Sequence, residues 1–228
     1  MSQSPILITG GAQRLGLHCA ERLLDDGHPV IVTYRREREA VAALRDRGAL
    51  TLQADFATRA GIESFIDRLK AQTRSLRAVV HNASEWLADP DPEAAGETFE
   101  RLFQVHMQAP YLINLAAREL LEACQEPQRD IVHITDSVVR RGAAEQAAYA
   151  ASKAGLESLT LSFAARFAPA IQVNAIAPGL VMLGEAIHTN RRVPGPGVVY
   201  QTLRYLLDND YVTGTVIAVD GGESLGAG

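Results

Sequence analysis

Short apolar runs alternate with longer amphipathic segments along the whole chain. Most of these runs are continuous and lack the strict alternation with polar residues that marks a half-exposed strand. Continuous runs of this length are typical of strands buried on both faces of a parallel sheet. They predict strands at residues 6–8, 30–32, 50–52, 78–80, 131–134, 171–173 and 216–219.

The segments between the runs carry apolar residues at helical spacing, as Leu15, Cys19 and Leu23 do. Strands that alternate with helices over the whole length predict an α/β fold. We therefore expect a single doubly wound Rossmann-type domain over residues 1–228, with a central parallel sheet flanked by helices. The pattern places helices at residues 15–26, 37–47, 60–73, 97–123 and 149–167.

Residues 180–197 are the one irregular stretch of the sequence, with three glycines and two prolines. This stretch follows a predicted strand late in the chain, where a substrate loop could lie. An ordinary surface excursion is the alternative interpretation.

The composition narrows the class of protein. The chain has 228 residues, of which 47% are hydrophobic, enough for a sizeable core. A net charge of -5 and the lack of a long basic run argue against a dedicated nucleic-acid binder. Cys19 and Cys124 show no CxxC spacing, so we expect buried thiols in a reducing cytosol and no metal site. With no leader and no apolar stretch of membrane-spanning length, we expect a soluble cytoplasmic protein without a membrane partner.

A glycine-containing turn follows the first predicted strand. It reads Thr-Gly-Gly-Ala-Gln-Arg-Leu-Gly over residues 9–16, and a helix is predicted directly after it. Glycines at such a turn let backbone amides approach a pyrophosphate, and the helix N-terminus adds favourable partial charge. The strict G-x-G-x-x-G spacing is absent, and a turn without a ligand is the alternative.

Two arginines follow the second predicted strand, where NAD-preferring sites usually carry an acidic residue. Arg35 and Arg36, with Arg14 close by, favour a dianionic phosphate through charge-assisted bonds. The sequence therefore predicts NADPH rather than NADH, unless the arginines only begin a solvated helix. Asp55 could hold the adenine amino group, and residues 82–84 would line the nicotinamide half of the cleft.

Tyr149 and Lys153 are four residues apart in a predicted helix, which places both on one face. A lysine at that position could lower the pKa of the tyrosine and make the phenol a proton donor. Asp136 closes the predicted strand thirteen residues before Tyr149. It could be an acid chosen for a particular substrate, or a plain helix cap or turn residue.

These motifs, with Asn82-Ala83 and the run from Val173 to Gly179, resemble the short-chain dehydrogenase/reductase family over nearly the whole chain. The family's glycine motif is T-G-x-x-x-G-x-G, and Arg14 replaces its middle glycine. Asp136 stands in place of the usual catalytic serine. Both changes resemble the pteridine reductase branch. The resemblance implies NADPH-dependent reduction of a dihydropterin, most often dihydromonapterin with dihydrofolate as a weaker substrate, by a homotetramer.

The resemblance also implies roles for individual residues. Asp136 and Tyr149 would be the catalytic pair, with Lys153 binding the nicotinamide ribose, and Trp86 would stack on the pterin ring. The proton could come from Tyr149, from Asp136 or from a water between them. The substrate-binding residues would be Ser84, Trp86, Asp136, Tyr149 and Leu180. The cofactor-binding residues would be Gly10, Arg14, Leu15, Tyr34, Arg35, Arg36, Asp55, Phe56, Asn82, Ala83, Ser84, Lys153, Pro178 and Gly179.

Two features depart from the family's pattern. His106 stands where the family commonly has an asparagine that kinks a helix and helps a proton relay. The substrate loop, roughly residues 181–196, is shorter than in the larger pteridine reductases. An NADPH-dependent reductase of ordinary ketones or aldehydes is therefore the nearest alternative, and a catalytically idle NADPH-binding sensor is another. The residues 212–214 and 220–222 would lie near a subunit interface.

Overall fold

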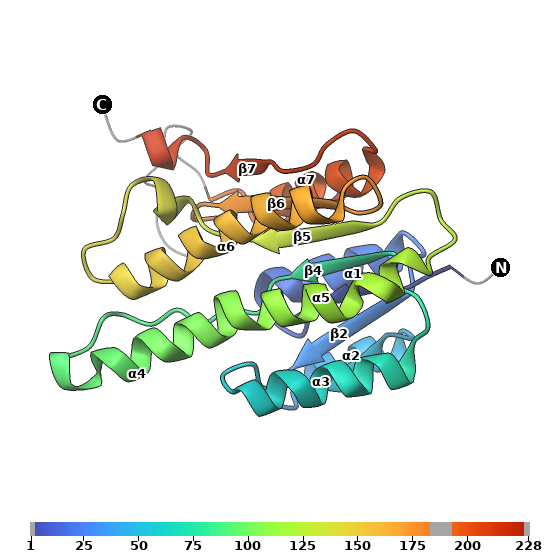
Figure 1. The fold of residues 1–228 in the computed structure, drawn as a ribbon, viewed down its shortest axis with the longest axis horizontal. Helices are drawn as coiled ribbons and strands as arrows, with labels where there is room; N and C mark the ends of the chain where they lie inside the picture. The colour runs from blue at the N-terminus through green and yellow to red at the C-terminus, as the bar shows by residue number, and fades with distance from the viewer. Residues whose placement is uncertain (1–2, 183–192, 226–228) are drawn as a thin grey trace.

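The structure is a computed structural model, which describes residues 3–182 and 193–225. Within these residues all strands belong to one parallel sheet, in the order β3-β2-β1-β4-β5-β6-β7 (Figure 1). The sheet confirms the doubly wound α/β fold that the alternating pattern predicts. The strands are β1 (Ile6–Ile8), β2 (Val30–Tyr34), β3 (Leu50–Gln53), β4 (Ala78–His81), β5 (Asp130–Ile134), β6 (Gln172–Pro178) and β7 (Val216–Val219).

Helices cover both faces of the sheet. The helices α3, α5 and α6 pack on the face turned toward the viewer in Figure 1, and α1, α2 and α7 pack on the other. The helices are α1 (Arg14–Asp25), α2 (Glu39–Asp46), α3 (Arg59–Gln72), α4 (Pro92–Phe103), α5 (Ala109–Glu122), α6 (Ala147–Phe167) and α7 (Gly197–Asp208). Short helical turns are η1 (Gln104–Gln108), η2 (Ser137–Arg140) and η3 (Glu223–Leu225).

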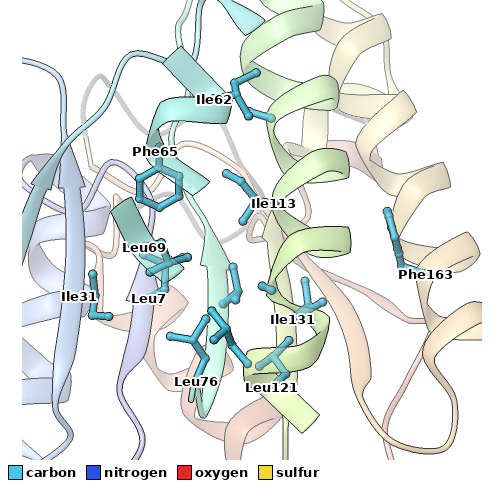
Figure 2. Packing of buried hydrophobic residues seen from close by; sticks show 14 of the residues in the cluster. Leu7, Ile31, Ile62, Phe65, Leu69, Leu76, Ile113, Leu121, Ile131 and Phe163 are labelled. Carbon is cyan, nitrogen blue, oxygen red and sulfur yellow. The ribbon is translucent and has the colours of Figure 1, made fainter. Parts of the chain in front are cut away.

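The two-residue repeat of a strand divides the core into two layers. Leu7 packs with Phe65 of α3 and Ile113 of α5, whereas its neighbours Ile6 and Ile8 belong to the cluster on the opposite face (Figure 2). Neighbouring residues of an inner strand such as β1 are therefore buried, which explains why the inner strands read as continuous apolar runs, whereas the edge strands β3 and β7 are partly exposed.

Two helical elements differ from the prediction. The expected helix at residues 97–123 begins earlier, at Pro92, and is interrupted by η1, a single π-helical turn. Helix α7 was not predicted, although Val199, Leu203 and Leu207 recur at helical spacing and are buried. The irregular stretch expected at residues 180–197 lies largely outside the described residues.

A chain of buried polar groups runs between β4, α5, β5 and α6. Asn114 lies 2.7 Å from Nε2 of His81 through its Oδ1 and 3.1 Å from Nε2 of His133 through its Nδ2. Nδ1 of His133 in turn contacts the hydroxyl of Thr160 at 2.8 Å. Burial lowers the pKa of His81 to about 4 and the pKa of His133 well below its usual value. Both imidazoles are therefore neutral near pH 7.

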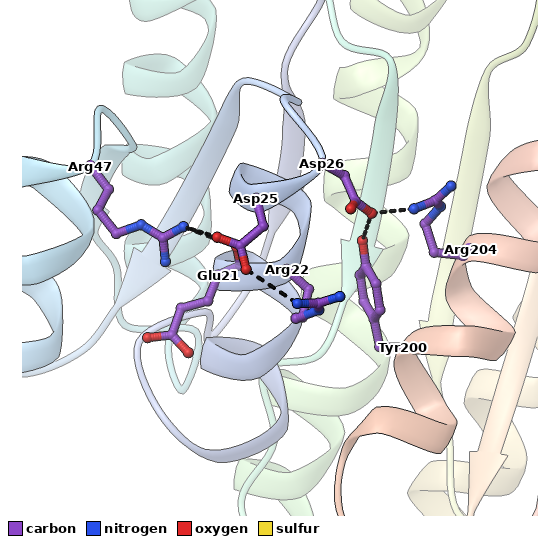
Figure 3. A network of polar contacts seen from close by, with 7 residues as sticks. All are labelled: Glu21, Arg22, Asp25, Asp26, Arg47, Tyr200 and Arg204. Atoms are coloured by element: carbon purple, nitrogen blue, oxygen red, sulfur yellow. Dashed lines mark hydrogen bonds and ion pairs between the residues drawn. The ribbon is translucent and has the colours of Figure 1, made fainter.

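Polar contacts fasten helix α1 to α7 (Figure 3). The hydroxyl of Tyr200 donates a hydrogen bond of 2.5 Å to Asp26, and Arg204 forms an ion pair with the same carboxylate. The hydrogen bond from Tyr200 is the largest cause of the lowered pKa of Asp26. Asp25, one residue earlier, contacts Arg22 and Arg47 at the surface, where such pairs contribute little stability.

The carboxyl ends of the parallel strands meet at one edge of the sheet. The strand order reverses between β1 and β4, and ligands of doubly wound sheets bind outside the strand ends at such a switch point. Among residues 3–182 and 193–225, no helix has the length and apolar character needed to cross a membrane.

Candidate active site

A cleft of about 400 Å³ opens at the carboxyl ends of the strands. The residues named from the sequence converge on it from the ends of six strands and from helix α6. Leu180 and His106 are not part of its wall. The lining residues that the sequence did not single out include Gln13, Thr33, Arg38, Glu85 and Thr135.

The glycine turn forms one end of the cleft. Gly10 has a φ of +64° and makes a close approach to the chain after β4, because a Cβ there would lie 2.9 Å from Cα of Ala83. The side-chain amide of Asn82 donates to the carbonyls of Thr9 and Gly10 at 3.0 Å each. Asn82 was expected to line the nicotinamide half, and the structure adds that it holds the turn in shape.

Arg14 takes the left-handed conformation of the glycine it replaces, with a φ of +49°. A side chain in this region costs roughly 1 kcal/mol, because Cβ crowds the following carbonyl. Its guanidinium lines the cleft together with those of Arg36 and Arg38. Arg38 was not named from the sequence, although it lies three residues after Arg35.

Arg35 has a partner that the sequence did not reveal. Its guanidinium forms an ion pair with Glu85, which follows β4. Arg101 of α4 binds the same carboxylate at 2.5 and 2.8 Å. Asp55 also stabilises the local backbone, since its Oδ1 accepts a hydrogen bond from the backbone N–H of Ala57 at 3.0 Å.

The centre of the cleft holds Asp136, Tyr149 and Lys153. The phenol of Tyr149 donates to Oδ2 of Asp136 at 2.9 Å, while Oδ1 accepts the backbone N–H of Val138 at 2.9 Å. Asp136 is therefore both the cap of η2 and the partner of Tyr149, which confirms the capping role, while its role as an acid for a substrate stays a prediction. The ammonium of Lys153 donates to the carbonyl of Ile134 at 2.9 Å.

The pKa of Tyr149 moves in the direction opposite to the one predicted from Lys153. Burial and the adjacent Asp136 carboxylate raise it above the usual value of a phenol. The prediction was wrong because Lys153 contacts the strand carbonyl and lies 5.7 Å from the ring centroid. Burial lowers the pKa of Lys153 itself to about 8, against the opposing effect of Asp136.

His106 lies fully buried within η1 and has hydrogen bonds on both ring nitrogens. Nε2 accepts the backbone N–H of Glu85 at 3.1 Å, so this nitrogen carries no proton. Nδ1 therefore donates to Ser152 at 2.8 Å, and the Ser84 hydroxyl, 2.9 Å from Nε2, also donates. Burial and the charge of Lys153 lower the pKa of His106 to about 2, which keeps the ring neutral.

Trp86 forms the outer wall of the cleft beside Tyr149. The two ring centroids are 4.5 Å apart and the planes meet at 61°. The indole is 58% exposed, so one of its faces is available to a planar ligand. Ser84, on the same segment, borders the cleft between Trp86 and the strand end.

Comparisons with known proteins agree with this geometry. A family model described as short chain dehydrogenase matches residues 4–191. Dihydromonapterin reductase of Enterobacter sp. (strain 638) is 45% identical over 234 residues, which cover 98% of each chain. The enzyme of the same name from Klebsiella pneumoniae is 44% identical over 232 residues and 97% of each chain. The crystal structure of FolM Alternative dihydrofolate reductase 1 from Brucella suis in complex with NADP superposes with a TM-score of 0.88 at 29% identity, covering 98% of this chain and 96% of that chain.

Proposed function

Because the chain belongs to the short chain dehydrogenase family, we propose that it is an NADPH-dependent reductase of dihydropterins. Its preferred substrate in this proposal is 7,8-dihydromonapterin, which it reduces to tetrahydromonapterin. Dihydrofolate is a weaker substrate. The names of the two bacterial relatives and of the Brucella structure support this choice of substrate and cofactor.

The observation that carries the proposal is the hydrogen bond from Tyr149 to Asp136, made inside a cleft bordered by an exposed tryptophan. A serine hydroxyl at this position suits a substrate carbonyl or alcohol. A carboxylate suits the amino-pyrimidine edge of a pterin, because it accepts hydrogen bonds from amino and ring N–H groups. Trp86 offers a flat apolar face to the planar bicyclic ring.

The residues of the other half of the cleft fit a phosphorylated dinucleotide. Gly10 lets the backbone approach a pyrophosphate closely, and four arginines line the same cleft, Arg14, Arg35, Arg36 and Arg38. In this assignment Gly10 and Leu15 bind the pyrophosphate, and Arg14, Tyr34, Arg35 and Arg36 bind the phosphorylated ribose. The adenine lies at Asp55 and Phe56, and the nicotinamide half lies along Asn82, Ala83, Ser84, Lys153, Pro178 and Gly179. Leu180 is assigned to the substrate.

Reduction of the C=N bond needs hydride at carbon and a proton at nitrogen. Bound NADPH supplies the hydride. Tyr149 supplies the proton, and its raised pKa keeps the phenol protonated at every working pH. This weak acid is sufficient, because a nitrogen becomes strongly basic as its carbon accepts hydride. The phenolate that remains regains a proton from water, while Asp136 orients the phenol and holds the pterin edge.

We also place this activity in a cytoplasmic homotetramer of single-domain chains. Aromatic and aliphatic side chains half-exposed on α4, α5 and α6 support an interface there, namely Phe99, Phe103, Tyr111 and Leu161. Tyr211, 96% exposed beside residues 212–214, and Leu225, 86% exposed after residues 220–222, support a second interface. The oligomeric state is tested by light scattering of the purified protein.

The substrate is tested by following NADPH oxidation with dihydromonapterin, dihydrobiopterin, dihydrofolate and simple ketones side by side. We expect the pterins to be reduced with the highest kcat/KM and dihydromonapterin to lead them. Faster turnover of a ketone would favour an ordinary carbonyl reductase. Tight NADPH binding without turnover of any of them would favour an idle NADPH-binding protein.

A further inference from the structure

The segment from Ser84 to Asp89, called the Trp86 loop below, lines the cleft with its first three residues and carries Trp86 against Tyr149. It belongs to no helix or strand. Its apolar contacts come from Trp86, whose ring meets Tyr149, and from Leu87, which packs against the small cluster of Leu102, Val138 and Tyr149. A segment with so little regular structure needs other contacts to keep Trp86 beside Tyr149.

The first end of the loop is held by His106, in addition to the ion pairs of Glu85 with Arg35 and Arg101. Nε2 accepts both the backbone N–H of Glu85 and the hydroxyl of Ser84, and Nδ1 binds Ser152 of α6. Ser152 in turn donates to the carbonyl of Tyr149 at 2.7 Å. One neutral ring thus links the loop to the helix turn that carries Tyr149 and Lys153. Its edge also meets the Tyr149 ring, with centroids 5.4 Å apart.

The second end of the loop is held by Asp89. Its carboxylate accepts the backbone N–H groups of Ala147 and Ala148 at 2.6 and 3.1 Å, at the first turn of α6. The helix's own preceding residue, Gln146, makes no side-chain cap there. The backbone N–H of Asp89 also donates to the carbonyl of Glu145 at 2.8 Å. A carboxylate is favourable at a helix N-terminus, since it meets unpaired N–H groups and the positive end of the dipole.

We propose that His106 and Asp89 are positioning residues that fasten the two ends of the Trp86 loop to helix α6, and so set Trp86 at a fixed distance from Tyr149. Both anchors lead to the same helix, on either side of Tyr149. The indole and the proton donor therefore belong to one rigid unit with their rings in contact, and a planar substrate meets the exposed indole at a fixed position. The consequence for substrate binding rests on the proposed pterin reduction, whereas the placement of the indole does not.

The first test uses the fluorescence of Trp86 in the free enzyme, because the chain has a single tryptophan. His106→Gln keeps an acceptor near the place of Nε2, whereas His106→Asn reaches only to the place of Nδ1. We expect time-resolved anisotropy of H106Q to match that of the unchanged protein and H106N to gain a fast component of large amplitude. Equal behaviour of the two variants, whether both rigid or both mobile, would overturn the role of Nε2.

The second test compares Asp89→Ala with Asp91→Ala. Asp91 precedes α4 in the same connection and makes no side-chain cap, so it is the matched control. We expect D89A to gain the fast anisotropy component and to raise the KM for dihydromonapterin about tenfold, with kcat within about twofold. D91A should change neither. Circular dichroism and melting curves show that each variant is folded before it is compared.

The two readouts separate this proposal from the assigned substrate. A mobile indole in D89A and H106N, without pterin turnover by any form, would support the anchors and contradict the pterin assignment. Normal anisotropy in D89A, with active pterin turnover, would overturn the anchor while leaving the substrate assignment intact. A fall in melting temperature with an unchanged anisotropy and an unchanged KM would show a merely structural role.

Discussion

The phenol of Tyr149 and the carboxylate of Asp136 share a hydrogen bond of 2.9 Å, and the second oxygen of Asp136 caps the turn that follows it. The backbone contact fixes the orientation of the carboxylate before any ligand binds. Asp136 is therefore oriented in advance to accept hydrogen bonds from Tyr149 and from the substrate side of the cleft. A serine hydroxyl could also accept a hydrogen bond there, but it carries no negative charge.

Replacing Asp136 with serine should lower kcat/KM for dihydropterins about a hundredfold, because the charged partner of the pterin edge is lost. Activity on simple ketones should fall less or rise. Steady-state kinetics with both substrate classes check this expectation. Ser137→Ala, at the next residue, is the control and should leave both rates near normal. Unchanged pterin activity in D136S would remove the main support for the assigned substrate.

Replacing Asp136 with asparagine should lower the pKa of Tyr149. The carboxylate's charge and hydrogen bond both favour the neutral phenol, so removing the charge makes ionisation easier. The shift can be followed by ultraviolet absorbance of phenolate during a pH titration. Subtracting the spectrum of the D136N, Y149F double variant isolates Tyr149 from the other tyrosines. An unchanged titration would mean that burial alone sets this pKa.

The rate should fall as pH rises through about 8. Lys153 has a pKa lowered to about 8, so above that pH it loses the positive charge that, in the proposed function, binds the nicotinamide ribose. We expect the kcat/KM profile to show a descending limb there in the unchanged enzyme. Lys153→Met should be slow at every pH and should lack that limb. A descending limb of the same midpoint in K153M would assign the titration to another group.

The preference for NADPH should depend on the arginines at the outer end of the cleft. Arg14→Ala combined with Arg35→Ala should raise the KM for NADPH at least tenfold and leave the KM for NADH nearly unchanged, because only the former carries the added phosphate. Glu85→Gln should act in the opposite direction, since it releases Arg35 from its ion pair. Unchanged cofactor preference in the double variant would contradict the assigned phosphate position.

Stability should fall as pH falls below about 6.5. His81 has a pKa of about 4 and His106 of about 2, while unfolded histidines titrate near 6.5. The unfolded chain therefore binds more protons, and each such residue costs about 1.4 kcal/mol of unfolding free energy per pH unit in that window. Asp130, whose pKa burial raises to about 6, acts in the opposite direction and offsets part of the loss.

Urea unfolding at several pH values measures that slope. His81→Gln should reduce it, and His28→Gln, at a half-buried position outside the polar chain, should leave it unchanged. Identical slopes in both variants would show that His81 does not contribute.

The sequence was sufficient for the sheet and for most of the cleft wall, because both follow from periodicity and from spacing within short segments. Helix α7 was missed, although its buried residues recur at helical spacing, because the glycines and prolines before it drew the interpretation toward a loop. The turn η1 was also missed, although Pro110, two residues after it, lacks the backbone N–H that an uninterrupted helix needs.

The pKa values and charge pairs of the site were the hardest part to predict from the sequence. The sequence spacing of Tyr149 and Lys153 places them on one face, yet it does not show which atoms their polar groups reach. The ammonium of Lys153 donates to the Ile134 carbonyl, and the phenol of Tyr149 donates to Asp136. Burial and the Asp136 carboxylate then raise the pKa of Tyr149 despite the nearby lysine. The partnership of Arg35 with Glu85 joins two strand ends fifty residues apart and needs the folded chain to be seen.

Arg14 affects the stability of the fold and the choice of cofactor in opposite directions. Its backbone is held at a φ of +49°, a conformation that is unstrained for glycine and strained for arginine. Restoring glycine there should raise the melting temperature and at the same time weaken discrimination between the two nicotinamide cofactors. The unchanged chain would then be a compromise, in which a less stable turn is retained for the sake of selectivity. Directed stabilisation of this enzyme should therefore leave position 14 alone and begin at turns away from the cleft.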